Sequence, residues 1–204
     1  TCDYVMQKPF WNMVGNKKKI YYEKFLKIID QASLIGIKKI IVPLVDNSSL
    51  KNKQEEAKLI FYMKGLKKRL KINDQQILFE IDYNPQKTKR FIEKFDKSTF
   101  GINYDTGNSA GLGFDSNDEF KLYGKYIKNI HIKDKFLNGE TVRLGSGDAD
   151  FYKIFNNLKK ISYKNILILQ TARSKTNKHV HELNMNYSFL NNILKELNYE
   201  RIKK

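Results

Sequence analysis

Residues 77–105 read ILFEIDYNPQKTKRFIEKFDKSTFGINYD and contain two apolar runs separated by an amphipathic segment. The apolar runs Ile77–Asp82 and Phe100–Asp105 are short and rich in β-branched and aromatic residues, which is typical of buried strands. Between them, the apolar residues of Thr88–Phe95 fall at helical spacing. The stretch therefore predicts a strand, a helix and a second strand, which is one unit of a parallel sheet.

The same alternation of strand and helix extends along the rest of the chain. Further strands are predicted at residues 37–44, 127–133 and 165–170, with a strand end at residues 1–3. The predicted helices cover residues 17–36, 57–70, 88–95, 116–123, 151–160 and 183–197.

Strict alternation predicts parallel βα units joined by right-handed crossovers. A complete (β/α)8 barrel has eight strands and typically about 250 residues, whereas this chain has 204 residues and six predicted strands. We therefore expect one α/β domain over residues 1–204, a (β/α)8 TIM barrel with about six βα units that is truncated at the N-terminus. The alternative is a six-stranded doubly wound sheet. Against it, no Gly-x-Gly-x-x-Gly turn follows an early strand.

The composition argues against several kinds of partner. The formal net charge is +16, but the lysines are spread along the whole chain, so we do not expect a nucleic acid partner. The longest apolar runs are too short to cross a bilayer, and no membrane association is expected. The single cysteine, Cys2, cannot form an internal disulfide, which favours the reducing cytoplasm as the location.

Polar side chains stand at or near the ends of four successive predicted strands. The first strand carries Glu80 and Asp82, which share a face because strand side chains alternate. The next three strands carry Asp105, His131 and Gln170. In a parallel barrel the C-terminal strand ends meet at one mouth, where the chemistry of such folds takes place. Oxygen ligands with one imidazole suit Mn²⁺, Mg²⁺, Co²⁺ or Zn²⁺, so these residues predict a divalent-metal site.

Such a metal would polarise a carbonyl and its neighbouring hydroxyl, which makes it easier to remove the proton from the carbon between them. A carboxylate beside the metal can act as the base. Each residue also has a simpler explanation, because a strand-terminal Asp can cap the next helix and a lone His often hydrogen-bonds in a core. Their joint placement favours the site, since burying each group unpaired would cost several kcal/mol.

Four segments of the chain share their order and spacing with a known family. They are FEIDY at 79–83, GINYDTGN at 101–108, IHIKD at 130–134 and LGSGDADF at 144–151. Together they resemble the xylose isomerase-like TIM barrels, over residues 37–195. That superfamily includes sugar and sugar-phosphate isomerases, ketose 3-epimerases, inosose-type enzymes and endonuclease IV.

The resemblance implies a metal-dependent sugar or sugar-phosphate isomerase or epimerase, which removes a proton next to a carbonyl through an enediol. It implies metal ligands at Glu80, Asp105, His131 and the position of Gln170, and it gives Glu80 the further role of catalytic acid or base. Gln170 departs from the family pattern, because epimerases of this kind carry a second Glu there. An amide cannot exchange a proton at neutral pH, so a single-base isomerisation is easier to defend than two-base epimerisation.

The resemblance also implies that Asn108 and Lys133 line the substrate and that residues 144–148 form the loop before the next helix. The expected partner is a small carbohydrate or carbohydrate phosphate, and a homodimer is a compatible assembly. Arg173 is a further candidate for substrate binding, and Lys175 and Arg143 are also available for a phosphate. His179-Val180-His181 is expected in the last loop.

Two alternative functions stay open at this point. An abasic-site nuclease resembling endonuclease IV would need several histidine ligands, whereas His131 is the one candidate in the barrel and Asn108 stands where a relative often has His. A degenerate barrel used for binding or regulation is the second alternative, because Gln170 replaces a catalytic residue.

Overall fold

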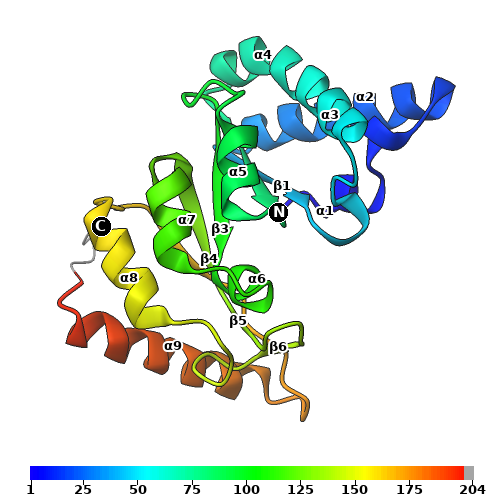
Figure 1. Cartoon of the computed structure of the whole chain (residues 1–204). Coiled ribbons are helices and arrows are strands. Elements are labelled where there is room, and N and C mark those ends of the chain that lie inside the picture. The colour runs from blue at the N-terminus through cyan, green and yellow to red at the C-terminus, as the bar shows by residue number, and fades with distance from the viewer. Residues whose placement is uncertain (200–204) are drawn as a thin grey trace. The chain divides into compact units, whose positions relative to one another are not determined.

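A computed structural model of the chain describes residues 1–199 and contains a five-stranded parallel sheet (Figure 1). Its strand order, β1-β2-β3-β4-β7, follows the order of the strands in the sequence. This confirms the α/β class and the TIM-barrel-like succession of strands. The strands are β1 (Lys39–Leu44), β2 (Gln76–Ile81), β3 (Phe100–Asp105), β4 (Ile127–Ile132) and β7 (Leu167–Leu169).

Helices separate the strands of the sheet, as the sequence predicts. A second, two-stranded antiparallel sheet pairs β5 (Asp134–Lys135) with β6 (Thr141–Val142). Within residues 1–199, the 3-10 helices are η1 (Phe10–Asn12), η2 (Asp46–Ser48) and η3 (Gly124–Tyr126). The α-helices are α1 (Asp3–Gln7), α2 (Gly15–Leu34), α3 (Lys53–Gly65), α4 (Lys67–Ile72), α5 (Pro85–Ile92), α6 (Thr106–Gly111), α7 (Ser116–Tyr123), α8 (Phe151–Lys160) and α9 (His179–Glu196).

Three local predictions differ from the structure. Asp3 begins helix α1, so residues 1–3 form no strand, although the Cys2 N–H donates to the Ile41 carbonyl across 2.8 Å. The helix predicted at 57–70 is divided at Leu66 into α3 and α4. His179 and His181 lie in the first turn of α9, because the helix begins four residues before the first apolar residue used to predict it, Leu183.

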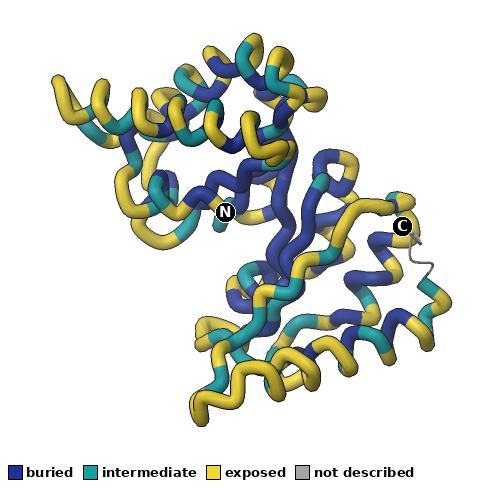
Figure 2. Tube along the Cα trace, turned by 180° about the vertical axis from the view of Figure 1, so that it is seen from behind, coloured by how far each residue is buried: buried dark blue, intermediate teal, exposed yellow. Residues whose placement is uncertain are grey.

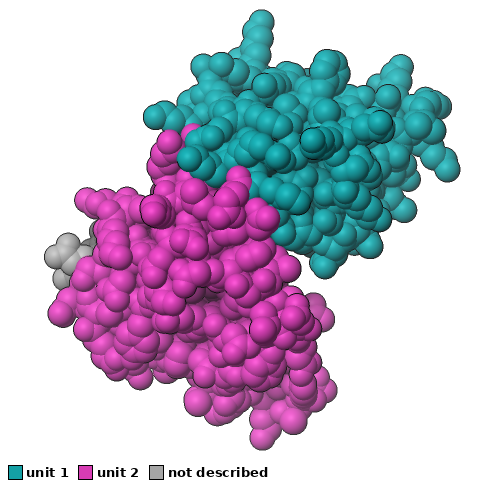
Figure 3. All heavy atoms as spheres, in the orientation of Figure 1, with its two compact units in different colours: residues 1–83, 87–103 teal, residues 84–86, 104–204 magenta. Residues whose placement is uncertain are grey.

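The described chain divides into two compact units (Figure 3). Unit 1 contains residues 1–83 and 87–103, and unit 2 contains residues 84–86 and 104–199. Strands β1 to β4 are buried along most of their length, whereas the helices alternate between buried and exposed residues (Figure 2). No helix among the described residues is long and apolar enough to cross a bilayer.

Unit 1 has an aromatic core beneath its strands. The fully buried ring of Phe79 on β2 lies 5.1 Å from the ring of Phe91, 5.0 Å from Phe95 and 5.9 Å from Phe100, measured between centroids. The Phe91 ring meets Phe79 edge-on, the Phe95 ring is tilted and the Phe100 ring is stacked, and such aromatic pairs stabilise a core beyond the area that they bury. This packing fixes β2 beside β3, in the parallel register Ile77 to Phe100 and Phe79 to Ile102.

Unit 2 buries one face of helix α8 against helix α9, and the two helices lie side by side in Figure 1. The rings of Phe151 and Phe189 meet edge to face at 5.6 Å. Asp150 caps α8 by accepting the Lys153 N–H at 2.9 Å, which satisfies a donor that the helix itself cannot pair. The helix predicted at residues 151–160 is therefore confirmed.

A buried carboxylate in unit 2, Glu119, is surrounded by hydroxyl groups. It accepts hydrogen bonds from Tyr104 at 2.8 Å, from Tyr123 at 2.6 Å, and from Ser109. Burial raises the pKa of the Glu119 carboxyl, and the three hydroxyl donors lower it by less. Compared with the unfolded chain, the folded chain therefore favours the neutral carboxyl. The stability that this gives is complete below the unfolded pKa and is lost as the pH rises through the folded pKa.

The Glu119→Gln variant, which cannot ionise, is expected to escape this loss. Relative to that of the parent, its free energy of unfolding, measured by urea denaturation, should increase as the pH rises above about 4.3, the ordinary pKa of a glutamate. Glu23→Gln, at an exposed position in α2, is the control and should show no such trend. A Glu119→Gln difference that is constant with pH would refute the account.

Candidate metal centre

Glu80 lies near the C-terminal end of β2 and is buried, with 7% of its surface exposed. The Asn103 side-chain amide, on the neighbouring strand β3, donates to Glu80 Oε2 across 2.8 Å. Asn103 is itself buried. This hydrogen bond holds the carboxylate in one orientation.

Asp105 ends strand β3 and has two tasks. Its Oδ1 accepts the Asn108 N–H at 2.8 Å and so caps helix α6. Its Oδ2 lies 3.9 Å from His131 Nδ1 and 3.6 Å from Lys133 Nζ. The capping role expected of a strand-terminal Asp and the ligand role are therefore compatible, because each uses a different oxygen.

His131 lies near the end of β4, and Lys133, two residues later, directly follows the strand. His131 is buried, with 3% of its surface exposed, and Lys133 is partly buried. The Lys133 ammonium donates to Asn108 Oδ1 at 3.1 Å. A Cβ on Gly107 would come 2.6 Å from Lys133 Cγ, so only glycine lets α6 approach this side chain. Asn108 and Lys133, both predicted to line the substrate, thus lie together beside Asp105.

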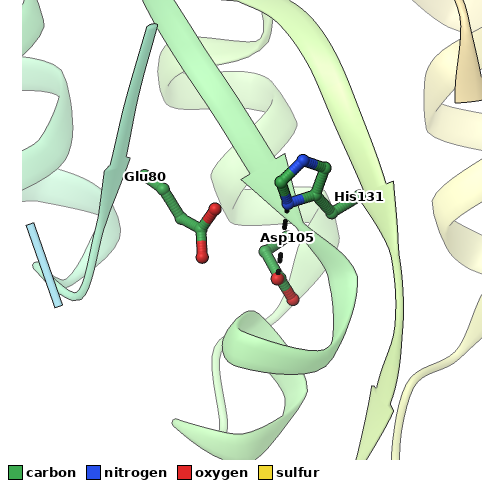
Figure 4. Close-up of side chains that lie close together, drawn as sticks. All are labelled: Glu80, Asp105 and His131. Carbon is green, nitrogen blue, oxygen red and sulfur yellow. Dashed lines mark ion pairs between the residues drawn. The ribbon is translucent and has the colours of Figure 1, made fainter. Parts of the chain in front are cut away.

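Glu80, Asp105 and His131 each offer one ligand atom, and these atoms all lie within 4.8 Å of one another. Figure 4 shows the three side chains at the ends of adjacent strands, with the carboxylates and the imidazole facing a common space. Two carboxylates and one imidazole suit the divalent cations that the sequence predicts.

The remaining predicted residues, Gln170, Arg173 and Arg143, come from segments outside strands β2 to β4. Gln170 follows β7 directly; its N–H donates to the Ile132 carbonyl at 2.9 Å, and the residue is exposed. Its role as a fourth ligand stays a prediction. Arg173 is exposed in the irregular segment between β7 and α9. Arg143 pairs with Glu182 through two hydrogen bonds, at 2.9 and 2.6 Å.

Two further polar residues lie near the strand ends. Asn103 was not predicted as part of the site, and Asp82 was noted without a role. Asn103 was missed, although its position two residues before Asp105 places it on the same strand face. Asp82, two residues beyond Glu80, is half-buried. Burial raises the pKa of the Asp82 carboxyl, a hydrogen bond from Ser49 lowers it, and the charge of Asp46 raises it again.

Comparison with known proteins identifies the family of the chain. The family model described as the xylose isomerase-like TIM barrel matches residues 4–200. The chain belongs to this family. The resemblance found in the four sequence segments is therefore confirmed. No curated protein matches the sequence significantly.

Several solved structures share the fold at low sequence identity. A xylose isomerase domain protein from Planctomyces limnophilus has a TM-score of 0.73 and 20% identity over 88% of this chain and 66% of its own. The IOLI protein with a binding zinc atom has a TM-score of 0.76 and 16% identity over 92% and 74%. D-allulose 3-epimerase from Methylomonas sp. in complex with D-allulose has a TM-score of 0.73 and 13% identity over 89% and 72%. The chain thus spans about two thirds to three quarters of the length of these structures.

Proposed function

We propose that this xylose isomerase-like barrel is a divalent-metal-dependent isomerase or epimerase of a small carbohydrate. The observation that carries the proposal is the convergence of buried Glu80, Asp105 and His131 ligand atoms within 4.8 Å. A zinc atom in one structural neighbour and D-allulose in another support the same choice of cofactor and substrate class.

Each side chain has a distinct part in the proposed reaction. A divalent cation held by Glu80, Asp105 and His131 would polarise the carbonyl and adjacent hydroxyl of a ketose. Glu80, oriented by Asn103, takes the proton from the hydroxyl-bearing carbon next to the carbonyl and returns it to the former carbonyl carbon through the enediol. In the same reaction the hydroxyl oxygen loses its proton and the former carbonyl oxygen gains one, so that the carbonyl moves to the neighbouring carbon. Lys133 donates to a substrate oxygen near the reacting carbons.

One carboxylate base accounts for isomerisation better than for epimerisation. Epimerisation by two bases needs a second group that exchanges a proton on the opposite side of the reacting carbon. Gln170, an amide, cannot do so at neutral pH. We therefore propose a single-base proton transfer, with Gln170 available as a neutral oxygen ligand.

The basic side chains favour a sugar without a phosphate. Three of the four candidates for phosphate binding already lie beside carboxylates: Arg143 at Glu182, Lys175 at Glu140 and Lys133 at Asp105. A phosphate would have to compete with these carboxylates for the same donors. We further propose that the reaction takes place in the cytoplasm, as the single cysteine suggests.

Solvent-deuterium incorporation tests the proposed chemistry directly. The protein is incubated in D₂O with Mn²⁺, Mg²⁺, Co²⁺ or Zn²⁺ and a panel of ketoses and their phosphates, and each sugar is analysed by NMR for exchange beside the carbonyl. We expect metal-dependent exchange in at least one unphosphorylated ketose. Absence of exchange across the panel with every metal would count against the proposal.

A further inference from the structure

The carboxylate of Asp134 is fully buried in unit 2 and is enclosed by one loop. Its Oδ2 accepts the N–H groups of Gly145 and Gly147, both at 2.9 Å, and its Oδ1 accepts the N–H of Ala149 at 3.1 Å. Hydrogen bonds to an ionised acceptor are roughly twice as strong as those between neutral groups. Asp134 thus fastens the loop of residues 145–149 to the start of β5.

The two glycines of this loop are required for different reasons. A Cβ on Gly147 would overlap Asp134 Oδ1 and come 2.7 Å from the Lys135 carbonyl oxygen. Gly145 has a φ of +83°, in the left-handed region that favours glycine. The Asp148 N–H also donates to the Lys135 carbonyl at 2.9 Å. The loop is therefore shaped to close on Asp134.

Lys133, the residue before Asp134, is held from the opposite side. Its backbone N–H donates to Thr106 Oγ1 at 2.9 Å, and the Thr106 hydroxyl donates to the Lys133 carbonyl at 2.5 Å. Consecutive residues of an extended segment direct their side chains to opposite faces. The Lys133 ammonium accordingly reaches Asn108 and Asp105, while the Asp134 carboxylate reaches the loop.

We infer that Asp134 is a positioning residue, which holds the Lys133 ammonium beside Asp105 and Asn108. It does so through its hydrogen bonds to the loop of residues 145–149, which fix the backbone at the end of β4. The inference deepens the proposed function, because Lys133 supplies the positive charge next to a proposed metal ligand. A long lysine side chain loses considerable rotamer freedom when it is held in one place. A fixed backbone at residues 133–135 is what keeps it there.

The first test measures the reactivity of Lys133 in the full-length chain. In Asp134→Asn, the side-chain amide has N–H groups where the carboxylate had an acceptor oxygen. It therefore cannot accept all three hydrogen bonds from the N–H groups of Gly145, Gly147 and Ala149. Acetylation with a limiting reagent, followed by peptide mass spectrometry, should show Lys133 modified several-fold faster than in the parent, relative to the other lysines. Asp150→Asn is the matched control, because it changes another carboxylate that accepts a backbone N–H, at the start of the following helix.

The second test uses Mn²⁺ binding, in which a structural role and a positioning role predict opposite signs. A cation beside Asp105 opposes the binding of a second cation, so Lys133→Met should bind Mn²⁺ on the order of tenfold more tightly. Asp134→Asn should shift the affinity in the same direction, because it releases the ammonium. General loosening of the site would weaken Mn²⁺ binding instead.

The combined outcomes separate the inference from the proposed function. Unchanged Lys133 reactivity in Asp134→Asn, equal reactivity in Asp150→Asn, or weaker Mn²⁺ binding would overturn the positioning role. If the parent binds no Mn²⁺ but Lys133 reactivity still responds to Asp134→Asn, the proposed function fails and the positioning role stands. Should Asp134→Asn not fold, Gly147→Ala, which crowds Asp134 Oδ1 and keeps the carboxylate, should produce a smaller change in the same direction.

Discussion

Replacing Glu80 by Gln is expected to reduce metal-dependent proton exchange by at least about 10³-fold, because it removes the general base of the proposed reaction. The amide retains the size of the side chain and an oxygen that can accept the Asn103 hydrogen bond. Folding should therefore be preserved, as circular dichroism and thermal unfolding would show. The rate is measured as deuterium incorporation into the best ketose of the panel.

Two control variants sharpen the Glu80 experiment. Glu93→Gln, at an exposed position after α5, should exchange deuterium at the parental rate. Asn103→Ala leaves Glu80 ionisable but removes its orienting hydrogen bond, so a smaller loss is expected than in Glu80→Gln. If Glu80→Gln retained the parental rate, Glu80 could not be the base.

Replacing Asp105 by Asn is expected to weaken divalent-metal binding by more than about 100-fold, since loss of an outer-shell partner alone typically costs 10- to 100-fold. Asparagine is as good an N-cap as aspartate, so the bond to the Asn108 N–H and helix α6 should persist. The substitution keeps the oxygen that caps the helix and removes the negative charge that attracts a metal ion. Isothermal titration with Mn²⁺ and Co²⁺ provides the affinity.

His131→Ala should lose affinity to a similar extent, because it removes the nitrogen ligand. Asp150→Asn is the appropriate control, since Asp150 caps helix α8 by the same type of hydrogen bond and is not a ligand. Its affinity for metal should equal that of the parent. Parental affinity in both Asp105→Asn and His131→Ala would exclude these residues as ligands.

The parts of the fold that depend on periodicity could be predicted from the sequence. Strands β2, β3 and β4 and helices α7 and α8 lie within one or two residues of their predicted bounds, because short apolar runs and helically spaced apolar residues report directly on burial. Helix α6 could not be predicted, since its sequence, TGNSAG, has no apolar period. It depends on the Asp105 cap and on the close approach of Gly107 to Lys133, both of which are tertiary contacts.

The part of the candidate site that follows from the order of the strands could be predicted from the sequence. Glu80, Asp105 and His131 could be grouped because adjacent parallel strands bring their C-terminal ends together. The role of Asn103 could not be predicted, because it depends on the hydrogen bond to Glu80, which the sequence does not show. The position of Gln170 depends on a short strand, β7, followed by an irregular segment, where the sequence contains little periodic information.

The central claim is that Glu80, Asp105 and His131 bind one metal ion together. Anomalous X-ray diffraction from crystals of the protein grown with Mn²⁺, recorded where manganese scatters anomalously, tests it most directly. We expect one strong peak within coordination distance, about 2.0–2.3 Å, of an oxygen of Glu80, an oxygen of Asp105 and a nitrogen of His131. A peak at other residues, or no peak within reach of all three side chains, would contradict the claim.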